Sequence, residues 1–428
     1  MAATTSWPPS DLMAWPHLSR LARWRAGSIR LRLRLLERLR LGRGDFAAPL
    51  RPAGDDLVIS GFFSQNSGVG YAARLTLDAM RRAGVPFIAH EIDLGPGVLR
   101  RGASVLPGQG GVWFIHANAQ ETLALLLAHD PRQWRDRRRI AYWVWETPEA
   151  PPEWASIARY VHEIWTPSIF SANGLRACFT RAGASDLIAR VRVVPHPVRS
   201  ITAPVSRPSS PLTVMMMFDA LSAVARKNPH GAIAAWFEAF PQPTSLARLV
   251  VKARNLTDRQ RRALMSTIDA RPDIELMEQE LSAAEMETLA AQTDIVMSVH
   301  RSEGFGLVLA EAMAQGKCVL CTGWSGNMDF MDENSAVLVP FELVPIDDPG
   351  GIYHGSHWAE PDIAAAGRLL RGLVEDGDRR TQIGAEARVR ALSLGEAWRP
   401  ERLKARLSGE ADQPAAAATA SAVIPNSL

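Results

Sequence analysis

Arg301-Ser302-Glu303-Gly304-Phe305-Gly306-Leu307-Val308-Leu309-Ala310-Glu311 places two carboxylates eight positions apart around a Gly-Phe-Gly turn. A run at residues 294–299 precedes it and favours a strand, and residues 308–315 favour a helix capped by Gly316. A glycine turn that opens a helix exposes backbone N–H groups at the positive end of the helix dipole, which suits a phosphate. We therefore expect a site for an extended ligand, touched by both acids. The alternative is an ordinary turn with solvated glutamates.

The rest of the chain alternates strand and helix patterns in two sets. In the first set we expect strands at 57–62, 87–92, 111–115, 140–145 and 191–194. A glycine turn at 66–71 should open a helix that ends near Gly84, and further helices are expected at 120–128 and 168–182. In the second we expect strands at 212–218, 247–252, 274–277, 295–299, 318–321 and 336–339, and helices at 230–240, 257–270, 284–291, 308–315 and 361–375. This alternation predicts an α/β fold with two doubly wound parallel sheets.

A proline-rich stretch after Pro195-His196-Pro197 separates the two sets and predicts a linker. The tail from Gly409 is rich in Ala, Ser and Pro, which is typical of disorder. The expected division is an extension, an N-terminal domain, a linker, a C-terminal domain and a final segment, at 1–55, 56–198, 199–211, 212–395 and 396–428.

The spacing and setting of the two acids resemble the acidic-x7-acidic motif of retaining, family-4-type (group 1) glycosyltransferases. The resemblance implies the GT-B fold, in which two Rossmann-like domains face a cleft. It also implies that Glu303 lies against the donor sugar and that Glu311 binds the ribose of the nucleotide. The amides that would face the sugar and the diphosphate are those of Gly304, Phe305, Gly306 and Leu307.

Further segments carry the same resemblance over residues 56–395. Gly68-Val69-Gly70 is similar to the N-terminal glycine loop that faces the donor phosphates, and a tight turn is its alternative. Three segments resemble bacterial polysaccharide-assembly members of the family, namely 142–148, 163–168 and 324–331. Of their tryptophans, Trp143 and Trp165 are expected in the core, since tryptophan is highly buried on average.

A departing nucleoside diphosphate develops negative charge, which cations must stabilise. The family usually supplies an Arg and a Lys, and Lys227 matches the lysine at a helix start. The position six residues earlier, where the arginine is common, is Leu221. Arg226, Lys252 or Arg254 are the candidate substitutes, and solvated side chains are the alternative for all of these cations.

Two more segments suggest sites. His116 ends a predicted strand on the side where open α/β sheets bind ligands, and the resemblance implies a place near the donor sugar or the acceptor hydroxyl. A histidine satisfied at a helix start is the alternative. Asp376-Gly377-Asp378 mimics a metal-binding Asp-x-Asp, but it follows a predicted helix whose natural C-cap is Gly377, which favours a solvated turn.

The composition is that of an ordinary globular protein of 428 residues, with 47% hydrophobic and 22% charged residues. Three cysteines argue against a disulfide framework and indicate a reducing compartment. Cys318 and Cys321 form a C-x-x-C, a pattern that redox and zinc sites use. Because they are an odd number of positions apart on a predicted strand, their thiols should point to opposite faces, which favours the core.

The first 50 residues are basic. They hold nine arginines against three acids, a charge of +6, so the rest of the chain carries −3 of the net +3. A helical wheel separates apolar residues from arginines, and we predict an amphipathic helix at residues 18–43 that docks on an anionic membrane surface. The alternatives are an extension packed on the domain and an organellar transit peptide. No run reaches the eighteen or so apolar residues of a transmembrane helix.

The resemblance implies a retaining, metal-independent enzyme that moves a hexose from a GDP- or UDP-linked sugar to a glycan or lipid-linked saccharide. Its setting would be bacterial polysaccharide synthesis in the cytoplasm, with no cofactor and no nucleic-acid partner. The leaving diphosphate would act as the base, so no protein nucleophile is required. The alternatives are a nucleotide-sugar epimerase of the same fold and a non-catalytic, membrane-associated module that binds sugar nucleotides.

Overall fold

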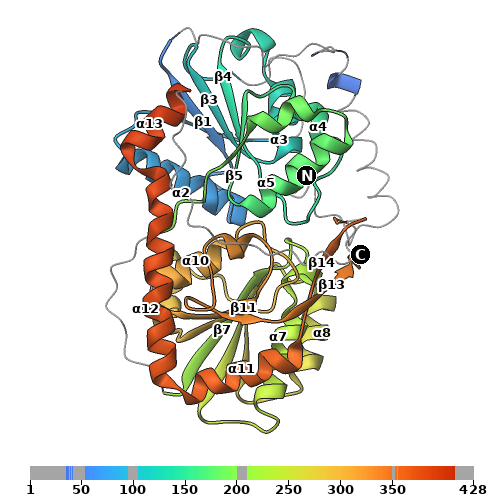
Figure 1. Ribbon diagram of the computed structural model, residues 1–428, viewed down its shortest axis with the longest axis vertical. Helices are drawn as coiled ribbons and strands as arrows, with labels where there is room; N and C mark the ends of the chain where they lie inside the picture. Colours follow the sequence, from blue (N-terminus) through green and yellow to red (C-terminus); the bar gives the residue numbers. More distant parts are fainter. Residues whose placement is uncertain are drawn as a thin grey trace, which may run out of the picture.

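The computed structural model describes residues 35–37, 39, 41, 54–94, 105–199, 210–348, 352–353 and 355–409. They form two six-stranded sheets, each flanked by helices and stacked one above the other in Figure 1. Every pairing within these two sheets is parallel. The predicted fold of two doubly wound parallel sheets is confirmed.

The N-terminal sheet has the order β2-β1-β3-β4-β5-β6. Its strands are β1 (Leu57–Gly61), β2 (Ile88–Glu91), β3 (Val112–His116), β4 (Arg138–Tyr142), β5 (Glu163–Thr166) and β6 (Val191–Val193). Its helices are α2 (Gly68–Arg82), α3 (Ala119–Ala128), α4 (Trp154–Ala158) and α5 (Ile169–Arg181). Strands β1 and β4 are buried along their whole length, as strands covered by helices on both faces must be.

The C-terminal sheet has the order β12-β11-β10-β7-β8-β9. Its strands are β7 (Leu212–Asp219), β8 (Ala247–Arg254), β9 (Ile274–Met277), β10 (Ile295–Ser298), β11 (Cys318–Thr322) and β12 (Val337–Val339). Its helices are α6 (Val224–Lys227), α7 (Pro229–Ala239), α8 (Asp258–Ile268), α9 (Ala283–Gln292) and α10 (Leu307–Ala314). Gly316 follows α10 at a φ of 72°, and its amide donates to the Met313 carbonyl at 2.8 Å, so the predicted glycine cap is confirmed.

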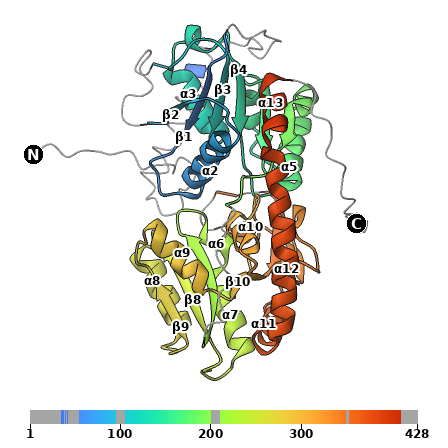
Figure 2. The same ribbon diagram turned by 90° about the vertical axis from the view of Figure 1, so that its left-hand side faces the viewer.

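Two later parts of the chain tie the domains together. The antiparallel hairpin of β13 (Phe341–Pro345) and β14 (His357–Pro361) leaves the C-terminal domain, and its Trp358 packs into the core around β3 and α3. Helix α11 (Ile363–Glu375) crosses the bottom of the C-terminal domain, and α12 (Gly377–Ser393) then leads back up the side of the molecule (Figure 1). Helix α13 (Pro400–Ser408) lies beside the N-terminal domain (Figure 2), where Leu403 joins the core under β1.

Most predicted elements occur within a few residues of their expected bounds, but several were missed: the short elements α4, α6, β5, the β13–β14 hairpin and α13, and the 17-residue helix α12. The strand predicted at 140–145 begins two residues earlier, at Arg138. It includes Arg139, a fully buried arginine whose guanidinium donates to the backbone carbonyls of Tyr160 and Trp134, so its charge lies inside the core. Gly377 does not cap α11 but opens α12, because Asp376 ends one helix and caps the next through its carboxylate.

Cys318 and Cys321 are buried free thiols in core clusters on opposite faces of the C-terminal sheet, as predicted. Trp143 and Trp165 are fully buried, which confirms their place in the core. The linker residues 200–209, the tail 410–428 and most of the predicted amphipathic helix lie outside the described residues. Within the part that the structure describes, no helix is long and apolar enough to span a membrane.

Candidate active site at the domain interface

The glycine turn of the acidic motif is held between the two domains. The carbonyl of Gly304 accepts hydrogen bonds from Ser168 Oγ at 2.5 Å and from Ser171 Oγ at 3.2 Å, both at the start of α5 in the N-terminal domain. A Cβ at position 304 would lie 2.5 Å from Cγ1 of Val144, so only glycine fits without a shift of its neighbours. The turn is therefore fixed against the N-terminal domain by packing and by hydrogen bonds.

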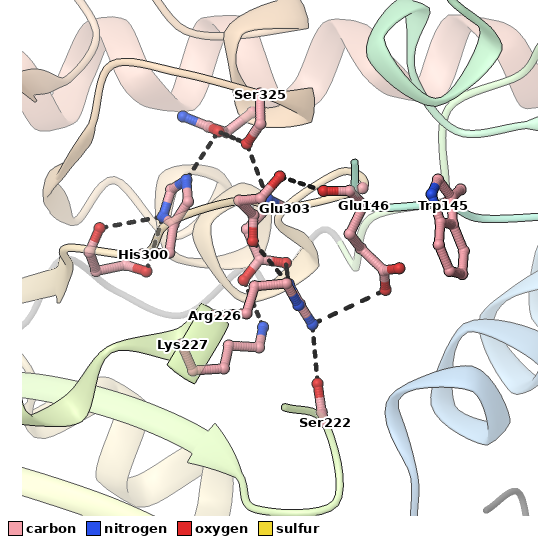
Figure 3. A network of polar contacts seen from close by, with 12 residues as sticks. Trp145, Glu146, Ser222, Arg226, Lys227, His300, Glu303 and Ser325 are labelled. Carbon is pink, nitrogen blue, oxygen red and sulfur yellow. Dashed lines mark hydrogen bonds and ion pairs between the residues drawn. The ribbon is translucent and has the colours of Figure 1, made fainter. Parts of the chain in front are cut away.

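Glu303 lies between two cations (Figure 3). Lys227 Nζ donates to Glu303 Oε1, and Arg226 Nη1 is 3.2 Å from Glu303 Oε2. Glu303 is 9% exposed and Arg226 only 3%. Burial alone would raise the pKa of Glu303, but the charges of Lys227 and Arg226 outweigh it and hold the pKa at about 2. The carboxylate is thus ionised at neutral pH, while burial lowers the pKa of Lys227.

The two cations project from α6, whose short length is set by its ends. Ala223 before it and Asn228 after it both adopt positive φ, of 44° and 53°. Asn228 also caps α7 by accepting from the Gly231 amide at 3.1 Å, and its Nδ2 donates to the Val299 carbonyl at 2.9 Å. These bonds join the start of α7 to the end of β10, so Lys227 is placed beside the acidic motif by the backbone.

A buried polar network supports Glu303 from behind. Its amide donates to Ser325 Oγ at 2.8 Å, and Ser325 holds an unusual φ of 83°. Asn327 Oδ1 lies 3.2 Å from Ser325 Oγ and 3.1 Å from Nε2 of the fully buried His300. Such a satisfied network is rigid, so it fixes the backbone from which Glu303 projects.

A carboxylate from the N-terminal domain approaches the same cations. Glu146 follows β4, and its Oε1 lies 3.8 Å from Arg226 Nη2 (Figure 3). Its Oε2 accepts from the hydroxyl of Tyr353 at 3.1 Å, and its backbone carbonyl accepts from Ser302 Oγ. One guanidinium is thus flanked by an acid from each domain.

Glu311 lies on α10, one helix turn beyond the glycine turn. Its Oε1 accepts a hydrogen bond of 2.5 Å from the hydroxyl of Tyr71, which belongs to α2 of the N-terminal domain. Burial raises the pKa of Glu311 to about 7, although the Tyr71 hydrogen bond and the charge of Arg199 both act to lower it. The first amides of α10 have no carbonyl partners within the helix and remain able to bind an anion.

The Gly68–Gly70 loop faces the C-terminal sheet. Arg254, at the end of β8, donates to the carbonyl of Asn66 and to Asp219 Oδ2, the latter at 2.6 Å. The Asn66 side chain donates to Glu280 Oε1 at 3.0 Å. The structure therefore brings the predicted loop to the same interface as Glu311, while Arg254 is paired with Asp219 at a distance from Glu303.

Lys252 and His116 make no hydrogen bond or ion pair with Glu303 among the described residues. Lys252 is buried, its Nζ donates to the Gln279 carbonyl at 2.8 Å, and its charged neighbours are Arg254, Glu278 and Glu280. His116 is 2% exposed, and its ring stacks on Tyr142 at a centroid distance of 4.7 Å, while the His196 ring lies 5.0 Å from Tyr142 and 6.1 Å from His116. Neither ring nitrogen of His116 has a hydrogen-bond partner among the described residues, and burial lowers its pKa to about 4.

Sequence reasoning gave no role to Tyr71, Glu146, His300, Ser325 or Tyr353. Tyr71 follows the quoted glycine loop directly, and Glu146 and Ser325 lie inside two of the segments that carried the resemblance. The segments in or beside which Tyr71, Glu146 and Ser325 lie were recognised from the sequence. Their patterns did not show which side chains turn toward the acidic motif. Tyr353 lies in an unpredicted hairpin and gave no signal. The described residues contain no group of three or more His, Cys, Asp or Glu able to hold a metal ion.

One family model matches part of the chain. Residues 224–390 match the family model described as glycosyl transferases group 1. The match runs from α6 almost to the end of α12 and includes Arg226, Lys227 and both acids of the motif. The C-terminal domain therefore has the sequence pattern of a group 1 glycosyltransferase. No curated protein matched the chain.

Solved structures of GT-B glycosyltransferases share the fold over about four fifths of the chain. HepE of Anabaena, solved in complex with UDP and glucose, is 13% identical with a TM-score of 0.57, over 83% of this chain and 100% of its own. OtsA is 12% identical with a TM-score of 0.56, over 83% of this chain and 99% of its own. Sucrose-phosphate synthase of Thermosynechococcus elongatus is 12% identical with a TM-score of 0.55, over 82% of this chain and 98% of its own. At these identities the likeness concerns the fold, and the fold is GT-B.

Proposed function

We propose that the protein is a retaining glycosyltransferase that transfers a hexose from a nucleotide sugar to a glycan or lipid-linked saccharide. The observation that carries the proposal is the position of Glu303, ionised between Lys227 and Arg226 and immediately before the N-terminus of α10. This arrangement offers one anion for the sugar hydroxyls and a cluster of positive groups for the diphosphate. The family match of the same segment supports it.

The leaving diphosphate requires positive charge in the transition state, and the chain can supply it from side chains and backbone. Lys227 and the amides at the start of α10 would contact the phosphate oxygens. Leu221, at the position of the usual arginine, is an exposed apolar residue, whereas Arg226 contacts the same carboxylate as Lys227. Arg226 therefore takes the place of the missing arginine. In this proposal the charge comes from the protein, so transfer needs no metal, and the leaving phosphate accepts the proton of the attacking hydroxyl.

The donor is proposed to be a GDP- or UDP-linked hexose, and the pathway to be bacterial polysaccharide synthesis. HepE has been solved with UDP-glucose, which makes UDP-glucose the first donor to test. The segments 142–148 and 324–331, which suggested polysaccharide assembly, lie on opposite sides of the interface and both contribute to the site, through Glu146 and Ser325.

The test is binding and turnover of sugar nucleotides by wild type, Glu303→Gln and Lys227→Met. A thermal-shift screen should reveal a nucleotide sugar that raises the melting temperature, since a ligand that binds only the folded state stabilises it. Wild type should hydrolyse or transfer the sugar of that donor, and each variant should lose about 100-fold or more of this activity. Epimer formation without hydrolysis or transfer would instead indicate an epimerase, and binding without any turnover would indicate a binding module.

Docking on an anionic membrane is a second part of the proposal. Among the described residues of the predicted amphipathic helix, Leu36 and Leu41 pack against the N-terminal core, while Leu35 and Leu39 are exposed. The exposed leucines, together with the arginines around them in the sequence, suit an interfacial helix. Deletion of residues 1–50 should abolish sedimentation with vesicles that contain anionic lipid, and unchanged sedimentation would refute this part.

A further inference from the structure

The hydrogen bond between Tyr71 and Glu311 connects the two domains at the carboxylate to which the family resemblance assigns the ribose. Tyr71 lies in the first turn of α2, which begins with the Gly68–Gly70 loop. Its hydroxyl donates to Glu311 Oε1 at 2.5 Å. The two residues are 240 positions apart, so the contact exists only when the domains are packed as they are in this structure.

A third part of the chain converges on the same pair. Arg199 follows β6 at the end of the N-terminal domain, and its charge acts on both Tyr71 and Glu311. Its Nη1 also donates to Glu287 Oε1 on α9, at 3.2 Å. Glu311 is therefore faced by a phenol from the N-terminal domain and by a guanidinium from the segment that precedes the linker.

We propose that Tyr71 is a positioning residue of the nucleotide-sugar site, which holds the Glu311 carboxylate in the orientation that binds the ribose hydroxyls. The inference rests on the proposed function and extends it, because it makes the N-terminal domain part of the ribose subsite. An ionised carboxylate has about four lone-pair sites. One hydrogen bond from Tyr71 therefore leaves enough acceptors for two ribose hydroxyls.

Two physical effects support this role. A carboxylate fixed by an existing hydrogen bond loses less rotamer freedom when the ligand binds, so affinity is gained by preorganisation. In addition, the Tyr71 hydrogen bond opposes the burial that raises the pKa of Glu311 to about 7. It therefore favours the ionised form of the carboxylate near neutral pH, and ionised acceptors form stronger hydrogen bonds with hydroxyl groups.

The experiment measures nucleotide affinity by calorimetry in wild type and Tyr71→Phe. The probes are UDP and GDP, each with its 2′-deoxy counterpart, and the pair that binds wild type is used. We expect Tyr71→Phe to weaken the ribonucleotide about 5- to 20-fold and the 2′-deoxynucleotide much less, so that discrimination between the two shrinks. We also expect the affinity of the variant to fall more steeply than that of wild type between pH 8 and pH 6.

Tyr160→Phe is the matched control, because it removes another phenol that donates to a carboxylate, here Glu37 at 3.2 Å, on a different face of the N-terminal domain. It should leave both affinities unchanged. Equal weakening of the two nucleotides by Tyr71→Phe, with no change in pH dependence, would show a merely structural role and overturn the proposal. Tighter ribonucleotide binding would overturn it too, since Tyr71 would then compete with the ribose. If wild type binds no nucleotide, the proposed function itself fails.

Discussion

At the scale of single residues, the site contains two glutamates whose surroundings drive their pKa values apart. The charges of Lys227 and Arg226 hold the pKa of Glu303 at about 2, whereas burial raises the pKa of Glu311 to about 7. The first remains an anion under all physiological conditions. Glu311 titrates near neutrality. Its ionised form destabilises the folded state more than that of Glu303 does, because the charge is buried beside a neutral phenol and the guanidinium of Arg199.

Glu311→Gln is therefore expected to stabilise the protein while it impairs nucleotide binding. Because the pKa of Glu311 is raised in the folded state, folding takes up a proton between pH 4.5 and 7, and stability falls as pH rises through this window. Above pH 7 the full penalty is present, at most about 3 kcal/mol from the pKa difference. The glutamine keeps the acceptor for Tyr71 and removes the charge.

Thermal unfolding of wild type and Glu311→Gln at pH 5 and pH 8 measures this effect. The variant should melt a few degrees higher than wild type at pH 8, and the difference should shrink at pH 5. A variant that is less stable at pH 8 would show that the carboxylate stabilises the fold through contacts that outweigh its burial.

Much of the C-terminal half of the candidate site could be predicted at this scale, because it lies within two short stretches of sequence. Glu303, its glycine turn and Lys227 were all placed by motif and spacing, and they meet in the structure. Tyr71 and Glu146 could not be predicted in the same way. Each reaches its partner across the domain interface, and no local periodicity reports which side chain of a loop crosses such an interface.

At the scale of elements, the packing of α12 on α10 fixes the helix that carries Glu311. The contact depends on two glycines. A Cβ at Gly384 of α12 would collide with the backbone carbonyl of Gly316, which ends α10. Since backbone cannot rotate away as a side chain does, any larger residue at 384 must push the two helices apart.

Gly384→Ala is expected to destabilise the C-terminal domain by about 1–3 kcal/mol. Gly372→Ala in α11 provides the control, because a Cβ there meets no atom within 4 Å and alanine favours a helix interior. Gly372→Ala should raise the free energy of unfolding by about 0.5–1 kcal/mol. Urea unfolding compares the two variants, and equal effects would contradict the close approach of α10 and α12.

At the scale of the whole molecule, the chain crosses between the domains more often than its sequence indicates. Two sets of alternating strands and helices predicted one crossing, at the prolines after His196. The structure adds the β13–β14 hairpin and the return of α12 and α13. The hairpin and α13 are short, and their buried residues Trp358 and Leu403 pack against the N-terminal domain, so periodicity along the chain could not reveal these crossings.

The return of α13 leads to a prediction about the N-terminal domain from a residue near the end of the chain. Leu403 is fully buried with Leu57, Ile59 and Phe114 of the N-terminal sheet, so Leu403→Ala should leave a cavity there and cost about 2–5 kcal/mol. The exposed Val389 on α12 is the control, and Val389→Ala should change stability little. Hydrogen exchange should show faster opening of β1 and β3 in Leu403→Ala, with β7 and β8 unchanged. Faster exchange confined to the C-terminal domain would mean that α13 packs on that domain. It would contradict the packing of the C-terminal segment on the N-terminal sheet.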